Sequence, residues 1–474
     1  MIVCVTLLEA LRSFPHDEPR EVRYRRGKEL RQHLPRAAHA EVPAADRRPD
    51  PIALLRAQDE SRIQQLVPIR YGRMSASPYA FLRGSATVMA SDLSLVPRSE
   101  MPVQACGDAH LSNFGMYASP ERSLVFDVND FDEAAVAPFE WDLKRLAASA
   151  ALVGRLDSDS SARQAAAAAV HAYQKTIHGL HKMSSLDAWH LQVDVQHALS
   201  LLRRHKKKTG DLLSTTAKAA RKAETKTSLT ALDKITTVVD GQRRIVSQPP
   251  LIVSLAEIQE PGLGDELVHV LTTYVETLDE RYLSLLRRFR IVDVAHKVVG
   301  VGSVGTRCLV ILLQGGDGEP LFLQAKEAGD AALAPYVAPS RYDLPSERVV
   351  RAQRVLQASS DELLGWSKTT GGRAYYIRQW HDMKGSIDPL SLDAEGLASY
   401  AALCGAVLAR AHGRSGDASV IAGYIGKGHQ FVSAVTDFAL AYTDIVSSDY
   451  GRLQQAIADG EVPSEVETGA GTSG

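Results

Sequence analysis

Residues 107–142 contain the side chains best suited to chemistry. Asp108 and Asn113 stand five positions apart, ahead of the strand-like run Leu124-Val125-Phe126. Three acids follow that run: Asp127, Asp130 and Asp132. Phosphoryl transfer needs one carboxylate near the acceptor hydroxyl, together with an amide oxygen and a second carboxylate that hold Mg²⁺. The spacing predicts Asp108 as the residue that orients or deprotonates the hydroxyl, and Asn113 and Asp130 as magnesium ligands.

Two alternatives within this acid cluster stay open. Asp127 and Asp132 are alternative metal ligands, because spacing alone does not rank three neighbouring acids. Asp130 is preferred because it follows the strand-like run and directly precedes an aromatic residue. It also lies twelve residues before Asp142, which we expect to be a buried partner of backbone amides or of an arginine in the catalytic loop. The Asp108–Asn113 pair alone would also suit an ordinary turn, where such side chains bond nearby backbone.

A second block of chemistry follows much later in the chain. Three glycines lie between two β-like runs, and Lys326 ends a later strand whose alternate residues face one side. Glycines allow backbone amides to approach phosphates closely, because no Cβ intervenes. The lysine ammonium could then lie under the turn. This block predicts a nucleotide site made by Gly300, Gly302, Ser303, Gly305 and Lys326.

The glycine pattern would also suit a dinucleotide-binding turn or a structural hairpin. A dinucleotide-binding turn opens a helix, whereas the β-like run 309–313 follows here, so that interpretation is excluded. A glycine-rich hairpin of purely structural use remains an alternative. Glu347, at the start of a predicted helix, is the candidate partner of Lys326. The helix dipole alone would also favour a glutamate at that position.

Composition limits the class of protein. The chain has 474 residues, a formal net charge of −2 and 45% hydrophobic residues, which is typical of a globular protein. No whole-protein charge points to nucleic acid or an anionic membrane. The four cysteines are scattered, so neither a zinc site nor a disulfide framework is indicated. No apolar run is long enough to span a membrane, and no signal peptide is recognisable, so we expect a cytoplasmic protein.

Apolar and charge patterns, together with the two lobes that a resemblance of these motifs to protein kinases implies, divide the chain into six predicted parts. A helix over 395–412 is expected to end at His412, where a capping role is the simplest interpretation. The predicted parts are a weakly ordered basic lead-in (1–50), the catalytic-loop half of a large lobe (51–200), a helical excursion (201–290), a small lobe with the glycine-rich hairpin and lysine strand (291–390), helices that return to the large lobe (391–455) and a disordered tail (456–474).

Together these motifs resemble the protein-kinase-like superfamily, most closely aminoglycoside and choline kinases, whose pattern reads H-G-D-x-H-x-x-N. Gly107, His110 and Asn113 fall at that pattern's positions relative to Asp108, while Cys106 stands in place of its first histidine. The two blocks occur in the reverse of the usual kinase order. The resemblance therefore implies an α+β, two-lobed protein-kinase-like fold with circularly permuted connectivity and extra helices.

Over roughly residues 50–450 the chain also resembles the bacterial family known as domain of unknown function 2252. The segments 66–74, 106–115 and 298–306 carry that likeness. The resemblance to kinases implies an ATP- and Mg²⁺-dependent phosphotransferase acting on an unidentified acceptor hydroxyl. A nucleotide-binding pseudokinase or sensing scaffold, and an enzyme that transfers AMP, remain alternatives. Under each of these interpretations, Lys326 and Asp130 should face a common cleft.

Overall fold

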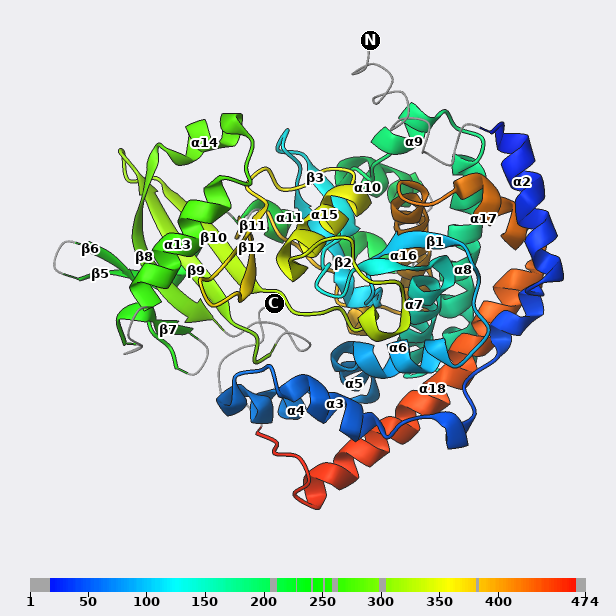
Figure 1. Ribbon diagram of the computed structural model, residues 1–474. Helices are drawn as coiled ribbons and strands as arrows, with labels where there is room; N and C mark the ends of the chain where they lie inside the picture. Colours follow the sequence, from blue (N-terminus) through cyan, green and yellow to red (C-terminus); the bar gives the residue numbers. More distant parts are fainter. Residues whose placement is uncertain are drawn as a thin grey trace, which may run out of the picture.

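The chain folds into a larger, mostly helical lobe and a smaller lobe built on a β-sheet (Figure 1). The computed structural model describes residues 18–204, 211–226, 228–239, 242–249, 252–257, 263–297, 304–380 and 383–465. The combination of helices and antiparallel strands agrees with the predicted α+β class. None of the helices in these ranges is both long and apolar enough to cross a membrane.

The core of the larger lobe forms around α7 (Phe139–Gly154), in which every residue is buried. It packs against α8 (Asp159–Leu180), α16 (Ala394–Gly413) and α18 (His429–Ala458). Small buried alanines on α8 allow α16 to lie close beside it. The other helices assigned to this lobe are α2 (Arg20–Glu29), α3 (Pro51–Asp59), α4 (Val67–Met74), α5 (Pro78–Gly84), α6 (Ala86–Ser94), α9 (Ser185–His190), α10 (Val195–Arg204), α11 (Leu212–Glu224) and α17 (Ala418–Ile425).

Two short β-ribbons in this lobe determine where the chemistry lies. The strand β1 (Pro102–Ala105) pairs with β4 (Ala135–Pro138), and β2 (Phe114–Ala118) pairs with β3 (Leu124–Val128). The loop 106–113 joins β1 to β2, and the loop 129–134 joins β3 to β4. Because the strands at both ends of these loops are paired, the two loops must lie side by side.

The smaller lobe contains a six-stranded antiparallel sheet with the order β11-β12-β10-β9-β8-β7. Its strands are β7 (Ile252–Ser254), β8 (Phe289–Lys297), β9 (Cys308–Gly315), β10 (Pro320–Glu327), β11 (Gly365–Lys368) and β12 (Ala374–Gln379). The succession of β8, β9 and β10, with a tight turn between the last two, confirms the predicted arrangement of strands. The apolar residues of α13 (Leu263–Val275) and α14 (Glu280–Leu286) cover one face.

The opposite face of the sheet is covered by α12 (Ser228–Ile235) and by the hairpin of β5 (Thr236–Val239) and β6 (Gln242–Ile245). The region 201–290 is therefore only partly the helical excursion predicted, because β7 joins the sheet as its edge strand. The helix α15 (Pro345–Leu356) packs against β11 and β12, and its apolar residues enter the core of the larger lobe.

The prediction of a weakly ordered basic lead-in is wrong for residues 18–50. The helix α2 packs along α17, and arginines that follow α2 bind the carbonyls at the end of α17. Arg31 Nε donates to Tyr424 O at 2.9 Å, and Arg36 Nη1 donates to Ile425 O at 3.0 Å. The last carbonyls of a helix have no partner within it, which explains why a basic segment is ordered there.

At the other end, the predicted tail begins too early. The helix α18 continues to Ala458, and Glu465 N donates to Pro68 O at 3.0 Å, so residues 456–465 pack on the larger lobe. Residues 466–474 and 1–17 lie outside the described ranges.

Arg48 provides a test of how much the N-terminal segment contributes to stability. Its guanidinium binds both Asp92 and Asp449, which are almost fully buried. We expect Arg48→Ala to lower the free energy of unfolding by about 3–5 kcal/mol, because two buried carboxylates lose their counter-charge. Urea unfolding measures the change, with exposed Arg25→Ala as the control. A loss in Arg48→Ala no larger than in the control would contradict a structural role for this segment.

Candidate active site

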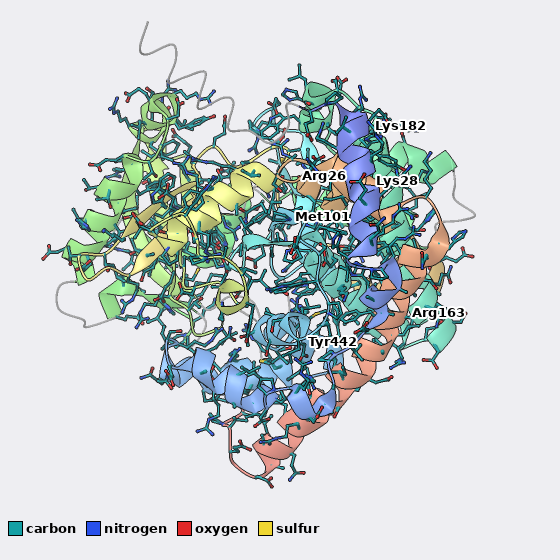
Figure 2. The ribbon with its side chains drawn as sticks, turned by 45° about the vertical axis from the view of Figure 1, so that its right-hand side comes forward. Arg26, Lys28, Met101, Arg163, Lys182 and Tyr442 are labelled. Atoms are coloured by element: carbon teal, nitrogen blue, oxygen red, sulfur yellow. The ribbon has the colours of Figure 1, made fainter. Side chains whose placement is uncertain are left out.

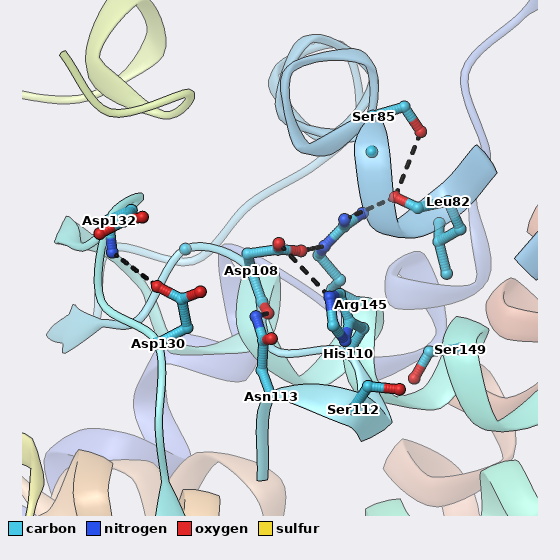
Figure 3. Close-up of polar contacts among 12 residues, drawn as sticks. Leu82, Ser85, Asp108, His110, Ser112, Asn113, Asp130, Asp132, Arg145 and Ser149 are labelled. Atoms are coloured by element: carbon cyan, nitrogen blue, oxygen red, sulfur yellow. Dashed lines mark hydrogen bonds and ion pairs between the residues drawn. The ribbon is translucent and has the colours of Figure 1, made fainter. Parts of the chain in front are cut away.

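The two adjacent loops of the larger lobe open onto a cleft of about 640 Å³. Figure 3 shows Asp108 and Asn113 from one loop beside Asp130 and Asp132 from the other. All four residues line the cleft. The small lobe contributes Thr306 and the segment 327–332, and further walls come from α3 and α5. The cleft therefore lies where both lobes and both predicted blocks of chemistry meet.

The backbone of the loop 106–113 is held by Asp142 in the first turn of α7. Its carboxylate accepts hydrogen bonds from Cys106 N at 2.8 Å and Gly107 N at 3.0 Å, which confirms the predicted binding of backbone amides. Gly107 has φ +81°, and a Cβ there would lie 1.9 Å from Glu133 O. Glycine is thus required both by the loop conformation and by the close approach of the second loop.

A buried histidine from the other end of the chain completes this support. His412 Nε2 lies 3.2 Å from Asp142 Oδ2, and its Nδ1 lies 2.9 Å from the hydroxyl of Tyr173. The sequence favoured a capping role for His412, but the fully buried side chain instead contacts the acid that supports the loop. The helix α16 therefore reaches the catalytic loop although it follows it by almost 300 residues in sequence.

Asp108 is engaged by an arginine that the sequence analysis missed. Arg145 Nε, on α7, forms a close ion pair with Asp108 Oδ1, and Arg145 Nη2 donates to Leu82 O at 2.8 Å. His110 Nε2 lies 3.6 Å from the other carboxylate oxygen. Burial raises the pKa of Asp108, while Arg145 acts in the opposite direction. A signal was present, since Arg145 follows Asp142 by three positions and so shares its helix face.

Asn113 is oriented by its own loop. Its Nδ2 donates to Asp108 O at 2.7 Å. Because the amide nitrogen is used in this way, the amide oxygen is the atom left for a ligand in the cleft. An amide oxygen is a hard ligand of the kind that Mg²⁺ prefers.

The structure separates the roles of the three clustered acids. Asp127 is buried and does not line the cleft: Arg410 Nη2 binds it at 2.5 Å, and Ala358 N donates to it at 3.1 Å. Asp127 is therefore corrected from an alternative metal ligand to a structural residue. Asp130 lines the cleft, and burial together with Asp132 raises its pKa. Among the three acids, Asp130 lines the cleft and has no salt-bridge partner among the described residues, although Lys326 and Arg378 act to lower its pKa.

Asp132 is the residue that receives Lys326. The ammonium lies 2.7 Å from Asp132 Oδ2, and Tyr376 donates its hydroxyl to Oδ1 at 2.6 Å. Lys326 and Tyr376 are opposite each other in the β10–β12 register, which presents both to the acid. Burial acts to raise the pKa of Asp132, but Lys326 and Tyr376 outweigh it and hold the pKa low. Lys326 also lies close enough to Asp130 to act against the rise in its pKa, although Lys326 is not among the residues that line the cleft.

Glu347 is not brought to Lys326. Its carboxylate binds Arg351, one helical turn along α15, at 3.2 Å. The neighbouring Arg348 faces the site instead and donates to the carbonyls of Asp132 and Ala134. One position along a helix rotates a side chain by about 100°, so the two neighbours face different ways. The assignment of Glu347 as a partner of Lys326 is thus wrong.

Of the predicted glycine turn, only its end can be placed. Gly300, Gly302 and Ser303 lie outside the described residues. Gly305 has φ +89°, and its carbonyl accepts a hydrogen bond from Ile63 N at 2.8 Å. The end of the turn therefore contacts the segment between α3 and α4 at the border of the cleft.

The donor set fits a cation that arrives with phosphate. Among the residues described, no three His, Cys, Asp or Glu side chains are grouped as a metal site. Asn113 and Asp130 both line the cleft, where each has an oxygen atom that could bind such a cation. Mg²⁺ characteristically takes one or two protein ligands and completes its shell with water and substrate phosphates.

Glu133 makes the stability of the protein depend on pH. Burial raises its pKa from 4.5 to about 7, although Ala332 N donates to the carboxylate. A folded-state pKa above the unfolded value means that the stability it contributes is complete below pH 4.5 and is lost as the pH rises through 7. Glu133→Gln should therefore gain stability relative to the parent between pH 5 and pH 8, by up to about 3 kcal/mol. Urea unfolding across this range, with exposed Glu121→Gln as the control, measures it. A difference that does not vary with pH would contradict the assignment.

The two acids Asp142 and Asp130 should respond differently to loss of charge. Asp142→Asn should lower the free energy of unfolding by about 1–3 kcal/mol, because the carboxylate accepts from two buried backbone amides. Asp130→Asn should not lower it, since the change relieves repulsion from Asp132. Thermal melting without ligand compares the two variants. Equal destabilisation would mean that both acids are structural.

Comparison with known proteins gives a family and no function. The family model described as an uncharacterized protein conserved in bacteria, DUF2252, matches residues 62–456. No curated protein and no solved structure matches the chain. The matched region includes both loops of the cleft, β10 and α16. The chain therefore belongs to the DUF2252 family.

Proposed function

We propose that this protein is an ATP- and Mg²⁺-dependent phosphotransferase with a permuted, kinase-like arrangement of its two lobes. The single observation that carries the proposal is the contact of Lys326 with Asp132 beside Asp108, Asn113 and Asp130. An amide and several carboxylates line the cleft, and a lysine from the sheet contacts one of those carboxylates, Asp132; these are the groups that phosphoryl transfer uses.

The order of elements in the smaller lobe supports the kinase-like part of the proposal. In protein kinases a glycine-rich loop joins the first two strands, and the lysine lies on the third. Here the segment with Gly305 joins β8 to β9, and Lys326 lies on β10. The helix α15 follows, as a helix follows the lysine strand in kinases. The departure is the partner of the lysine, which is Asp132 from the acid loop and not a helical glutamate.

Each residue of the cleft then has a defined part. Asn113 and Asp130 would hold Mg²⁺, which neutralises phosphate charge when bound. Lys326 would bind the phosphates of the nucleotide, exchanging part of its contact with Asp132. Asp108 would orient the acceptor hydroxyl and take its proton, and its burial-raised pKa favours that role. The cleft of about 640 Å³ has room for a small acceptor.

A second candidate function is a nucleotide-binding scaffold without turnover. The observation that favours it is the ion pair of Asp108 with Arg145, which stabilises the carboxylate and so lowers its tendency to take a proton. The two candidates differ in whether Asp108 matters for chemistry or only for structure.

Substitutions at three residues separate these functions. Asp108→Ala should leave the affinity for MgATP within a few-fold of the parent and should lower transfer by about 10²-fold or more. Lys326→Ala and Asp130→Asn should both weaken MgATP binding, because each removes a group that acts on the phosphates or the metal. Calorimetry measures binding. Intact-mass analysis of acceptor mixtures incubated with labelled ATP measures transfer, and the mass added distinguishes phosphate from AMP.

Lys368→Ala, at an exposed position of the same sheet, is the matched control and should behave as the parent does. If the parent binds MgATP but shows no turnover above Asp108→Ala, the scaffold function is favoured. If the parent binds no nucleotide, both functions are excluded.

A further inference from the structure

A second cavity, of about 400 Å³, lies on the larger lobe where α2 passes the end of α16. Figure 2 shows α2 in front of this region, with Lys182 near its upper end. The walls come from α2, from the segment between α8 and α9, and from the turn between α16 and α17. The cavity and the acid cleft share no lining residue.

The charge of this cavity is opposite to that of the cleft. Arg20, Arg23 and Arg414 line it, together with His181, and no carboxylate is among the lining side chains. Asp417 lies nearby and pairs with Arg23 at 2.8 Å, which offsets one of the three positive charges. Two arginines remain in excess. The cavity therefore favours an anion.

Arg414 has no salt-bridge partner among the described residues, although Asp127 lies near enough to act to raise its pKa. Burial lowers its pKa to about 10, and the nearby Arg410 acts in the same direction. Its guanidinium carbon lies over the Trp189 ring, 3.7 Å from the ring centroid, and its Nε donates to Val355 O at 2.7 Å. These contacts hold the cation in place but do not neutralise it. An anion in the cavity would stabilise it.

Hydrogen-bond donors remain for such a ligand. A guanidinium has five N–H groups. In the described chain, the hydrogen bonds of Arg20 involve one nitrogen, which donates to Lys182 O at 2.8 Å and His181 O at 3.5 Å. Those of Arg414 involve two. Hydroxyl groups also line the cavity, from Ser184, Ser185, Ser415 and Ser419.

We propose that this cavity is a binding site for a small phosphate-bearing molecule, held by Arg20, Arg23 and Arg414. Several guanidinium groups from separate elements suit a phosphate, whose oxygens can accept several charge-assisted hydrogen bonds at once. Exposed basic residues on the outer side of α2, including Arg26 and Lys28 in Figure 2, would attract anions to its entrance. The site goes beyond the proposed phosphotransferase function and does not depend on it.

The test uses pyrophosphate and inorganic phosphate as probes of the whole protein in buffer with EDTA. Without a divalent cation the acid cleft repels anions, so binding there is suppressed. Calorimetry should show saturable binding of pyrophosphate, and hydrogen exchange should slow in residues 181–189 and 413–419. Arg20→Gln should weaken binding by about tenfold or more. Arg20 is exposed, and within the described residues it donates to backbone carbonyls alone, so this variant should fold normally.

Two further variants sharpen the result. Arg414→Gln should weaken binding at least as much as Arg20→Gln. Arg163→Gln is the matched control, because Arg163 is an exposed arginine on α8 that pairs with Asp437 and does not line the cavity. Binding should be unchanged in that control. Absence of saturable binding by the parent, or equal binding by the parent and Arg20→Gln, would overturn the proposal.

Discussion

The ion pair between Lys326 and Asp132 is the contact on which the arrangement of the cleft depends. The lysine side chain is only 5% exposed, so water could not take the place of Asp132 as its partner. An almost fully buried ammonium without a counter-charge costs several kcal/mol, and the acid loop must therefore stay against β10. This pairing joins segments 194 residues apart and places Asp130 beside them. Burial and the neighbouring Asp132 raise the pKa of Asp130, while Lys326 acts in the opposite direction.

The loop 106–113 depends in turn on helices from the far end of the chain. Asp142 accepts hydrogen bonds from the backbone amides of the two residues that precede Asp108. His412 of α16 in turn contacts the Asp142 carboxylate. Arg410, about half a turn earlier on α16, binds Asp127 and the carbonyl of Leu356. One helix thereby supports the loop, the acid segment and the end of α15. These contacts explain why residues from both halves of the chain pack into one core.

Although the overall charge is only −2, the two cavities are lined by side chains of opposite charge. Acids outnumber basic residues among the residues that line the cleft between the lobes. Arginines outnumber acids among the residues that line the cavity beside α2. Arg414 lines the cavity beside α2, and Arg410, one turn earlier, binds Asp127 next to the acid loop of the cleft. The end of α16 therefore contacts residues near both cavities.

Local pattern was enough to predict much of this protein. Apolar spacing predicted α16 and the strands β8, β9 and β10, because burial on one face imposes a period on the sequence. Glycine and acid spacing identified Gly107, Asp108, Asn113 and Asp142, whose relations lie within one loop and the helix that supports it. The resemblance to kinases also implied that the two chemical blocks meet, but it gave Glu347 and not Asp132 as the partner of Lys326.

Tertiary structure alone decided the long-range pairings. Asp132 and not Glu347 meets Lys326, because the rotation of α15 turns Arg348 toward the site and Glu347 toward Arg351. The basic segment 18–50 is ordered because its arginines bind carbonyls at the end of α17 that lack partners within that helix. These acceptors lie almost 400 residues away, so the local sequence could not predict them. Ion pairs between distant segments leave no periodic trace in the sequence, so their partners emerge only when the chain has folded.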